Sequence, residues 1–165
     1  MTMKIKFITT GGTIDKIYFD AKSEFEVGSP QILEILRDAH VTFEYEVESV
    51  LRKDSLDMTD EDRQLIRERV EADPCPRIVI THGTDTMVQT ARWLRGIPAK
   101  TIVLTGSMQP ARFRVTDAVF NVGQAIGAVQ GLPPGVYLAM DGRIFDPDRT
   151  RKNVEKNCFE ETETG

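Results

Sequence analysis

Two segments rich in threonine and glycine carry the residue types that could do chemistry. Residues 9–13 read TTGGT and directly follow the apolar run KIKFI, and residues 81–86 read THGTDT and directly follow RIVI. A turn needs one or two glycines, but it does not need a threonine on each side of them. Glycine lets the backbone approach a ligand closely, and a threonine hydroxyl becomes a nucleophile when a base or a strong local field activates it. The two segments are therefore candidates for a reactive site.

The glycine loop at residues 9–13 is not a familiar nucleotide loop. A Walker loop needs GxxxxGK[ST], and the sequence contains no Gly-Lys-Ser or Gly-Lys-Thr. The dinucleotide fingerprint GxGxxG is not matched by TGGTID either. The net charge of −5 argues against a broad nucleic-acid surface, which needs clustered Lys and Arg. A small anionic or zwitterionic ligand stays compatible with this charge, since it needs only a local positive field.

Composition indicates one ordinary globular domain. The chain has 165 residues, 40% of them hydrophobic and 28% charged. No apolar run approaches the length of a membrane span, and the first residues do not resemble a secretory signal. Cys75 and Cys158 lie far apart without zinc-type spacing, so we expect two free thiols in a reducing cytoplasm. With two histidines and neither HExxH nor CxxC, we expect no metal and no cofactor.

Strand-like and helix-like patterns alternate along the chain. This alternation predicts an α/β fold with three layers: a mostly parallel, flavodoxin- or Rossmann-like sheet with helices on both faces. The period-two pattern of residues 42–50, with glutamates on one face, predicts an edge or half-covered strand. The predicted strands are 4–9, 42–50, 77–81, 101–106 and 135–140, and the predicted helices are 29–39, with a Ser29 cap and Pro30 at its first position, 59–72, 85–96 and 117–129.

Polar residues follow each predicted strand. In an open parallel sheet, ligands bind outside the carboxyl ends of the strands, so these segments should meet at one edge. Each residue alone has a simpler interpretation: Asp85 as a helix cap, Ser55 as a turn residue, Lys152 as a solvated lysine. Their joint placement favours a site. The segments are TTGGT, DSLDMTD with Ser55 and Asp57, THGTDT, TGSMQP with Ser107, and DGRIFD.

TTGGTI at residues 9–14 and THGTDTM at residues 81–87 resemble the two signature segments of the bacterial-type L-asparaginases, which are amidohydrolases with threonine nucleophiles. The resemblance covers the whole chain but only the larger, N-terminal domain of that family. It implies that residues 1–165 form a single short-chain domain of this type without the smaller C-terminal domain, with a charged, mobile tail from about residue 153. It also implies a homodimer or higher homo-oligomer. Further similarity runs through DSLDM, GSMQP, TDAVFNVGQA and DGRIFDPDRTRK.

The resemblance also implies catalytic roles, carried over by position. Thr13 matches the primary nucleophile and Thr84 the second catalytic threonine, with Asp85 and Lys152 as the partners of Thr84. Backbone N–H groups around Thr84, at the expected helix start, would stabilise the oxyanion. Thr10 we interpret as a backbone contact.

Substrate contacts are implied in the same way. Ser55 matches a contact to the substrate carboxylate, Asp85 the group that holds the α-amino group, and Ser107 a small residue beside the amide. Gly12, Leu56 and Gly83 complete the predicted substrate-binding set.

Two positions depart from the family pattern. Phe25, in EFEVG, occupies a position where the family usually has a tyrosine, and phenylalanine cannot relay a proton. Tyr18, in DKIYFD, lies nearer Thr13 in sequence and is our candidate substitute; its alternative is a loop aromatic that covers the core. Leu56 replaces a glutamine that contacts the substrate, which predicts weaker polar recognition.

These observations predict a cytoplasmic L-asparaginase that releases L-aspartate and ammonia through an acyl-enzyme. Three alternatives stay open: a hydrolase of another small amide, a non-catalytic module that binds asparagine or aspartate, and an ammonia donor that works with a partner protein. L-asparagine is the expected substrate, with no nucleic acid and no membrane as partners.

Overall fold

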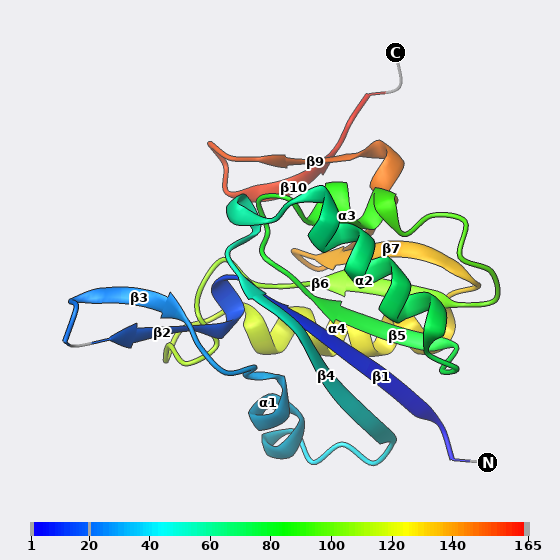
Figure 1. The fold of residues 1–165 in the computed structure, drawn as a ribbon, viewed down its shortest axis with the longest axis horizontal. Helices are drawn as coiled ribbons and strands as arrows, with labels where there is room; N and C mark the ends of the chain where they lie inside the picture. The colour runs from blue at the N-terminus through cyan, green and yellow to red at the C-terminus, as the bar shows by residue number, and fades with distance from the viewer. Residues whose placement is uncertain (1, 20, 164–165) are drawn as a thin grey trace.

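A six-stranded sheet forms the centre of the computed structural model, which describes residues 2–19 and 21–163 (Figure 1). Its order is β4-β1-β5-β6-β7-β8, and all neighbours pair in parallel except β7 and β8. This is the flavodoxin-type order, in which the chain reverses direction across the sheet at β1 and β5, so the predicted fold class is confirmed. The strands are β1 (Lys4–Gly11), β4 (Glu44–Lys53), β5 (Arg77–Thr81), β6 (Thr101–Thr105), β7 (Gly135–Met140) and β8 (Arg143–Phe145).

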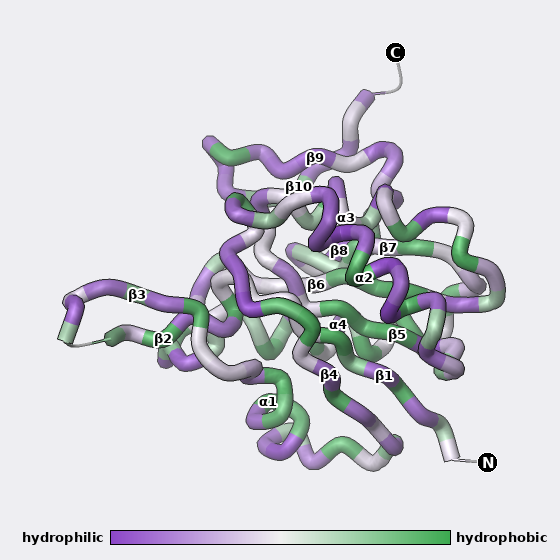
Figure 2. The backbone as a smooth tube through the Cα atoms, in the orientation of Figure 1, coloured by the Kyte–Doolittle hydropathy of each residue, from purple (hydrophilic) through white to green (hydrophobic). Residues whose placement is uncertain are grey.

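Helices cover both faces of this sheet, as predicted. The side chains of β5 show why: Ile78 and Ile80 are buried on the side of α2 (Asp60–Ala72) and α3 (Met87–Trp93), and Val79 is buried on the opposite side with α1 (Ile32–Asp38) and α4 (Ala118–Gly131). Continuous β-branched runs such as this are typical of strands covered on both faces. Hydrophobic residues accordingly gather in the central strands, whereas β9 is largely hydrophilic (Figure 2).

The strand β4 lies at the edge of the sheet and is partly exposed, which confirms the interpretation of its alternating pattern. Only one neighbour, β1, pairs with it in the main sheet. Its outward glutamates therefore stay at the surface while Val47 packs against the core.

Two β-hairpins were not predicted from the sequence. Strands β2 (Lys16–Phe19) and β3 (Glu24–Val27) form a hairpin that projects from the body, and β9 (Thr150–Asn153) pairs with β10 (Cys158–Glu161) above the sheet (Figure 1). The second hairpin occupies most of the segment for which we expected a mobile tail from about residue 153. Strand structure therefore continues to Glu161, and mobility there stays a prediction; residues 164–165 lie outside the described residues.

Two helix starts differ from the sequence prediction. Helix α1 begins at Ile32 with Gln31 as its N-cap and no side-chain cap, so the expected start at Ser29 and Pro30 is wrong. The reason is a tertiary contact, because the Gln31 N–H donates to the carboxylate of Asp15 at 2.9 Å. Helix α3 begins only at Met87, although we expected it from residue 85.

Within residues 2–19 and 21–163, no helix is long and apolar enough to span a membrane. Over the same described residues there is no group of three or more His, Cys, Asp or Glu side chains that could hold a metal ion.

A side-chain cap at the start of α2 stabilises this helix and can be tested directly. Thr59 and Asp62 form a capping box, in which the Thr59 side chain accepts the N–H of Asp62 and the Asp62 side chain accepts the N–H of Thr59. We expect Thr59→Ala to lower the free energy of unfolding by about 1 kcal/mol, measured by urea denaturation. Thr59→Ser keeps the hydroxyl and is the control; an equal loss in both variants would contradict the capping role.

Candidate active site

Glycine residues let three strand-end loops stack directly on one another. Gly12, after β1, has a φ of 87°, and a Cβ built on it would lie 2.5 Å from the Cα of Gly83, after β5. A Cβ on Gly83 would lie 2.6 Å from the Oγ of Ser55, after β4. Neither position has room for a side chain, so the loops carrying Thr13, Thr84 and Ser55 meet at the edge of the sheet where β1 and β5 are neighbours. The predicted convergence of these segments is confirmed.

Other hydrogen bonds hold the same loops in place. The Thr10 hydroxyl donates to the backbone oxygen of Thr81 at 2.8 Å, which confirms its interpretation as a backbone contact. Thr86 donates its hydroxyl to the Ser55 backbone oxygen at 2.8 Å, and its own N–H donates to the Ser55 Oγ at 3.3 Å. Ser55 is buried and therefore fixed between the β4 and β5 loops.

Lys152 joins the site from a distant part of the chain. Its Nζ donates to the Oγ1 of Thr84 at 2.8 Å and to the Oδ1 of Asp85 at 2.7 Å. The Lys152 side chain is only 13% exposed, so this pair is better shielded from water than an ordinary surface ion pair. Asp85 is not a helix cap, because Thr86 is the N-cap of α3 and Asp85 faces Lys152 instead.

The strand that carries Lys152 is fixed by residues that the sequence did not single out. Arg92 of α3 donates its Nε to the backbone oxygen of Pro147 at 2.8 Å and a guanidinium N–H to that of Thr150 at 3.4 Å. Phe159, opposite Lys152 in β10, is buried in the core beside Phe145. No local signal distinguishes Arg92 from other arginines on a helix surface, so only the fold reveals this role.

Thr13 begins the 3₁₀ turn Thr13–Asp15 and is partly exposed. Within the part of the chain that the structure describes, its hydroxyl donates to and accepts from no other protein group, whereas Thr84 is bonded to Lys152. The expected helix start at Thr84 is wrong, since Thr84 lies three residues before the first residue of α3. That N–H groups near Thr84 stabilise an oxyanion stays a prediction. Any N–H donors near Thr84 belong to the loop.

Ser107 lies buried in the loop after β6, where its Oγ donates to the backbone oxygen of Gln109 at 2.5 Å. Asp117 accepts the N–H groups of Met108 and Gln109 at 2.9 and 3.0 Å, and Asn121 donates to the backbone oxygen of Gly106 at 2.9 Å. Asp117 and Asn121 therefore position this loop from the start of α4. The TDAVFN segment that contains them was part of the similarity, but their roles were not predicted.

Tyr18 lies in the projecting hairpin and is 52% exposed. It pairs directly with Phe25 across the two strands, and the ring centroids are 5.3 Å apart. The ring of Phe25 also packs against the ring of Phe113, with the ring centroids 5.6 Å apart. The phenol of Tyr18 is thus adjacent to the position where the family pattern has its tyrosine, and Tyr18 is not a core-covering aromatic. Leu56, the other departure, is 72% exposed at the surface of the Ser55 turn.

His82 supports the loop that carries Thr84. It is fully buried, with Nδ1 2.7 Å from the backbone oxygen of Gly83 and Nε2 2.7 Å from the Thr90 hydroxyl. Burial lowers the pKa of His82 to about 4, against a smaller raising effect of the Gly83 oxygen. The ring is therefore neutral at neutral pH, donating from Nδ1 and accepting from Thr90 at Nε2. The sequence prediction did not include it.

Asp15 is a second buried titratable group beside the site. Burial raises its pKa to about 7, although the Gln31 N–H and the charge of Arg52 act in the opposite direction. Its backbone oxygen accepts the N–H of Gly28, so Asp15 holds both chain ends of the β2–β3 hairpin.

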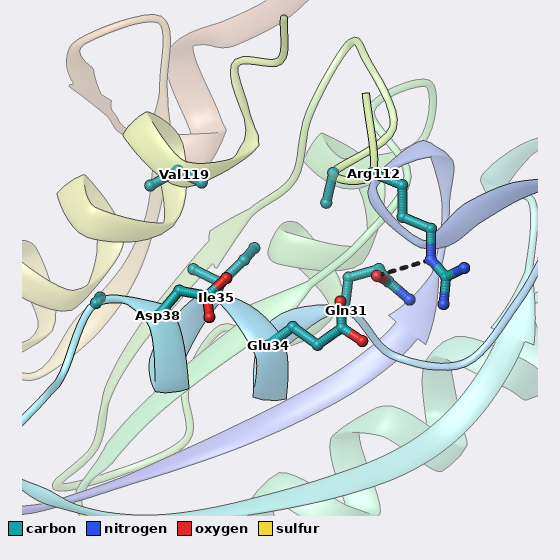
Figure 3. A pocket seen from close by; sticks show the side chains of 8 residues that line it. Gln31, Glu34, Ile35, Asp38, Arg112 and Val119 are labelled. Carbon is teal, nitrogen blue, oxygen red and sulfur yellow. Dashed lines mark hydrogen bonds between the residues drawn. The ribbon is translucent and has the colours of Figure 1, made fainter. Parts of the chain in front are cut away.

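A separate cleft of about 240 Å³ lies between α1 and the start of α4 (Figure 3). Glu34, Asp38 and Val119 line it, and the Nε of Arg112 donates to the Gln31 side chain at 3.1 Å at one end. None of the residues that line it belongs to the predicted site, so this cleft is separate from the candidate site at the strand-end loops.

The contact between Gly12 and Gly83 can be tested by adding one methyl group. We expect Gly12→Ala to lower the free energy of unfolding by about 1–3 kcal/mol, because the new Cβ meets the Gly83 backbone at a strained positive φ. Gly127→Ala is the matched control: no atom lies within 4 Å of its Cβ position in α4, and the change should stabilise by about 0.5–1 kcal/mol. Chemical denaturation measures both, and a neutral Gly12→Ala would contradict the close approach.

The two buried titratable groups should affect stability with opposite signs. His82, with its pKa lowered from 6.5 to about 4, contributes stability that is lost as the pH falls from 6.5 to 4. Asp15, with its pKa raised from 3.8 to about 7, contributes stability that is present below pH 3.8 and lost as the pH rises through 7. Between pH 4 and 6.5 the two effects oppose each other in the wild-type protein.

Replacing Asp15 with asparagine removes the titration of Asp15 and leaves that of His82. Asn keeps an acceptor for the Gln31 N–H, so Asp15→Asn should gain up to about 4 kcal/mol over wild type as the pH rises from 4 to 8, at about 1.4 kcal/mol for each pKa unit. Urea denaturation at several pH values measures this gain. Asp38→Asn, at an exposed aspartate, is the control; a pH-independent difference for Asp15→Asn would show that Asp15 is not protonated in the folded state.

Comparison with known proteins identifies the family of the chain. A model of the asparaginase N-terminal domain matches residues 4–164. L-asparaginase from Thermococcus kodakarensis is 35% identical over 172 residues, which cover 96% of this chain and 51% of that protein, and its structure superposes with a TM-score of 0.81. L-asparaginase I from Vibrio cholerae superposes with a TM-score of 0.83 at 27% identity, over 98% of this chain and 52% of that one.

The probable cytoplasmic L-asparaginase from Campylobacter jejuni superposes with a TM-score of 0.74 at 28% identity, over 96% of this chain and 51% of that one. The chain thus spans about half the length of these relatives. The match over nearly all of its residues confirms the resemblance seen in the sequence: this chain belongs to the asparaginase family and corresponds to the family's N-terminal domain.

Proposed function

We propose that this chain hydrolyses L-asparagine to L-aspartate and ammonia, with Thr13 as the nucleophile. The observation that carries the proposal is the position of the Lys152 Nζ, 2.8 Å from the Thr84 hydroxyl and 2.7 Å from the Asp85 carboxylate. Thr84 and Asp85 directly follow Gly83, whose backbone Gly12 contacts, and Gly12 directly precedes Thr13. A nucleophile, a second hydroxyl and a charged pair at one sheet edge suit acyl transfer.

The chemistry runs in two steps. In the first, the Thr13 Oγ attacks the amide carbon of the substrate, a C–O bond forms, and the hydroxyl proton passes to the group that becomes ammonia. The C–N bond then breaks and leaves an ester on Thr13. In the second, water attacks the ester carbon, aspartate leaves, and the proton from water restores the Thr13 hydroxyl. Thr84 and Lys152 carry the protons, because the hydroxyl can pass on a proton that the lysine ammonium donates, and the neutral amine left behind can take a proton back.

The remaining predicted residues bind substrate in this proposal. Asp85 holds the α-amino group, the Ser55 hydroxyl contacts the α-carboxylate, and the backbone near Ser107 lies beside the side-chain amide. Gly12 and Gly83 allow close approach of the backbone, because a side chain at either position would fill the space between the loops. Leu56 offers no polar contact where relatives use an amide, so we expect a weaker affinity.

Tyr18 is the proposed relay beside Thr13. Its exposed phenol lies next to Phe25 on a hairpin that is joined to the Thr13 turn through Lys16.

We further propose a cytoplasmic homo-oligomer, a dimer or larger, in which another subunit completes the amino-group side of the pocket. Two features support this proposal. Large apolar side chains are exposed at Val115, Phe120 and Val154, which favours burial against another subunit. The thiols of Cys75 and Cys158 are both free, which fits a reducing cytoplasm.

Ammonia release from L-asparagine by the purified chain tests the proposed activity. We expect wild type to release ammonia, and Thr13→Ala and Lys152→Met each to lose at least about 100-fold in kcat, because they remove the nucleophile and a proton carrier. Lys156→Met is the matched control, at an exposed lysine in the turn of the same hairpin. Full activity in Lys152→Met would contradict its role.

The same assay separates the alternatives. Ammonia from a different small amide, but not from asparagine, would favour the broader hydrolase. Saturable binding of L-aspartate by calorimetry, without ammonia release from any amide, would favour a binding module and overturn the enzymatic proposal.

A further inference from the structure

The turn between β7 and β8 binds the hairpin that carries Lys152. Asp141 and Gly142 form this two-residue turn, with φ angles of 54° and 77°. Positive φ at both positions is typical of the tight turns that join antiparallel strands. The Oδ2 of Asp141 accepts the backbone N–H of Phe159, in β10, at 2.8 Å. A side chain from a turn of the main sheet therefore holds the backbone of a strand outside it (Figure 1).

Phe159 lies directly opposite Lys152 in the β9–β10 pair. Within residues 2–19 and 21–163, β10 pairs with β9 alone, so the N–H that Asp141 accepts lies on the other edge of β10. Opposite residues of an antiparallel pair carry their side chains on the same face. The Phe159 ring on this face is buried beside Phe145, and the Lys152 side chain reaches Thr84. Asp141 therefore holds the residue whose position is most closely tied to that of Lys152.

We propose that Asp141 is a positioning residue, which sets the placement of Lys152 through the backbone of Phe159. Apolar contact of the Phe159 ring keeps the hairpin against the core, but such contact has no preferred direction. A hydrogen bond fixes both a distance and a direction. The catalytic consequence of this inference rests on the proposed function, but the placement of Lys152 by Asp141 does not.

Two substitutions separate the carboxylate of Asp141 from the conformation of its turn. Glycine adopts a φ of 54° without strain, so Asp141→Gly should keep the turn and lose only the contact. Asparagine also tolerates this conformation and keeps an acceptor for the Phe159 N–H, so Asp141→Asn should keep both. We expect the midpoint of thermal unfolding of both variants to stay within about 3 °C of wild type.

Hydrogen exchange measured by NMR tests the contact itself. The Phe159 amide should exchange up to about tenfold faster in Asp141→Gly and at about the wild-type rate in Asp141→Asn, because only glycine removes the acceptor. Asn157→Gly is the matched control: Asn157 is exposed and has a φ of 50° in the turn of the β9–β10 hairpin. An unchanged Phe159 exchange rate in Asp141→Gly would show that the carboxylate does not hold β10 and would overturn the inference.

Crystal structures of the same variants measure the placement of Lys152 without any activity. In Asp141→Gly the Lys152 Nζ should lie at least about 1 Å farther from the Thr84 Oγ1 than in wild type, a displacement large enough to impair catalysis. The distance should stay at its wild-type value in Asp141→Asn and Asn157→Gly. A Lys152 that stays at Thr84 in Asp141→Gly would also overturn the inference.

Kinetics of ammonia release test the catalytic consequence. Asp141→Gly should lower kcat about tenfold and change KM less, because a displaced proton carrier slows the chemical steps. Asp141→Asn and Asn157→Gly should stay within about threefold of wild type. Equal losses in Asp141→Gly and Asp141→Asn, or full activity in Asp141→Gly, would contradict the positioning role. If wild type releases no ammonia while Lys152 moves in Asp141→Gly, the proposed function fails and the placement by Asp141 stands.

Discussion

The direct contact between the backbones of Gly12 and Gly83 is the constraint on which the rest of the site depends. Parallel strands bring the loops after β1, β4 and β5 to the same sheet edge, but only roughly. Glycine sets the final spacing, because a Cβ at Gly12 would lie 2.5 Å from the Gly83 Cα and one at Gly83 would lie 2.6 Å from the Ser55 Oγ. Thr13 and Thr84 are each one residue beyond these glycines, so their separation follows from this contact.

The charged part of the site has a different origin. Lys152 belongs to a hairpin outside the main sheet, and its position is set by two anchors: Phe159, which is buried in the core, and Arg92, which binds the backbone before β9. A lysine held in this way loses little further conformational entropy when it acts, which is the advantage of a preorganised site. The core therefore fixes the candidate site through the hairpin as well as through the sheet.

The sequence predicted the features that short-range patterns determine. Continuous apolar runs such as 77–81 predicted buried strands, and residues 59–72 were predicted as a helix. The hairpins were not predicted, because strands such as Lys16–Phe19 are short and their residues are half-buried or exposed, so they carry no buried face of their own. Likewise the local pattern around Asp85 favours a helix cap. In the folded chain Asp85 instead forms an ion pair with Lys152, which is distant in sequence. The family resemblance named Lys152 and Asp85 as partners of Thr84, and the structure gives the distances between them.

The central claim is that the loops after β1, β4 and β5 form one binding site with Lys152. A crystal structure of the chain with L-aspartate tests it most directly. We predict that bound aspartate places its side-chain carboxyl between Thr13 and Thr84, its α-amino group on Asp85 and its α-carboxylate on Ser55. Aspartate bound in the cleft between α1 and α4, or a site at these loops that stays empty at saturating aspartate, would contradict the claim that these loops form the binding site.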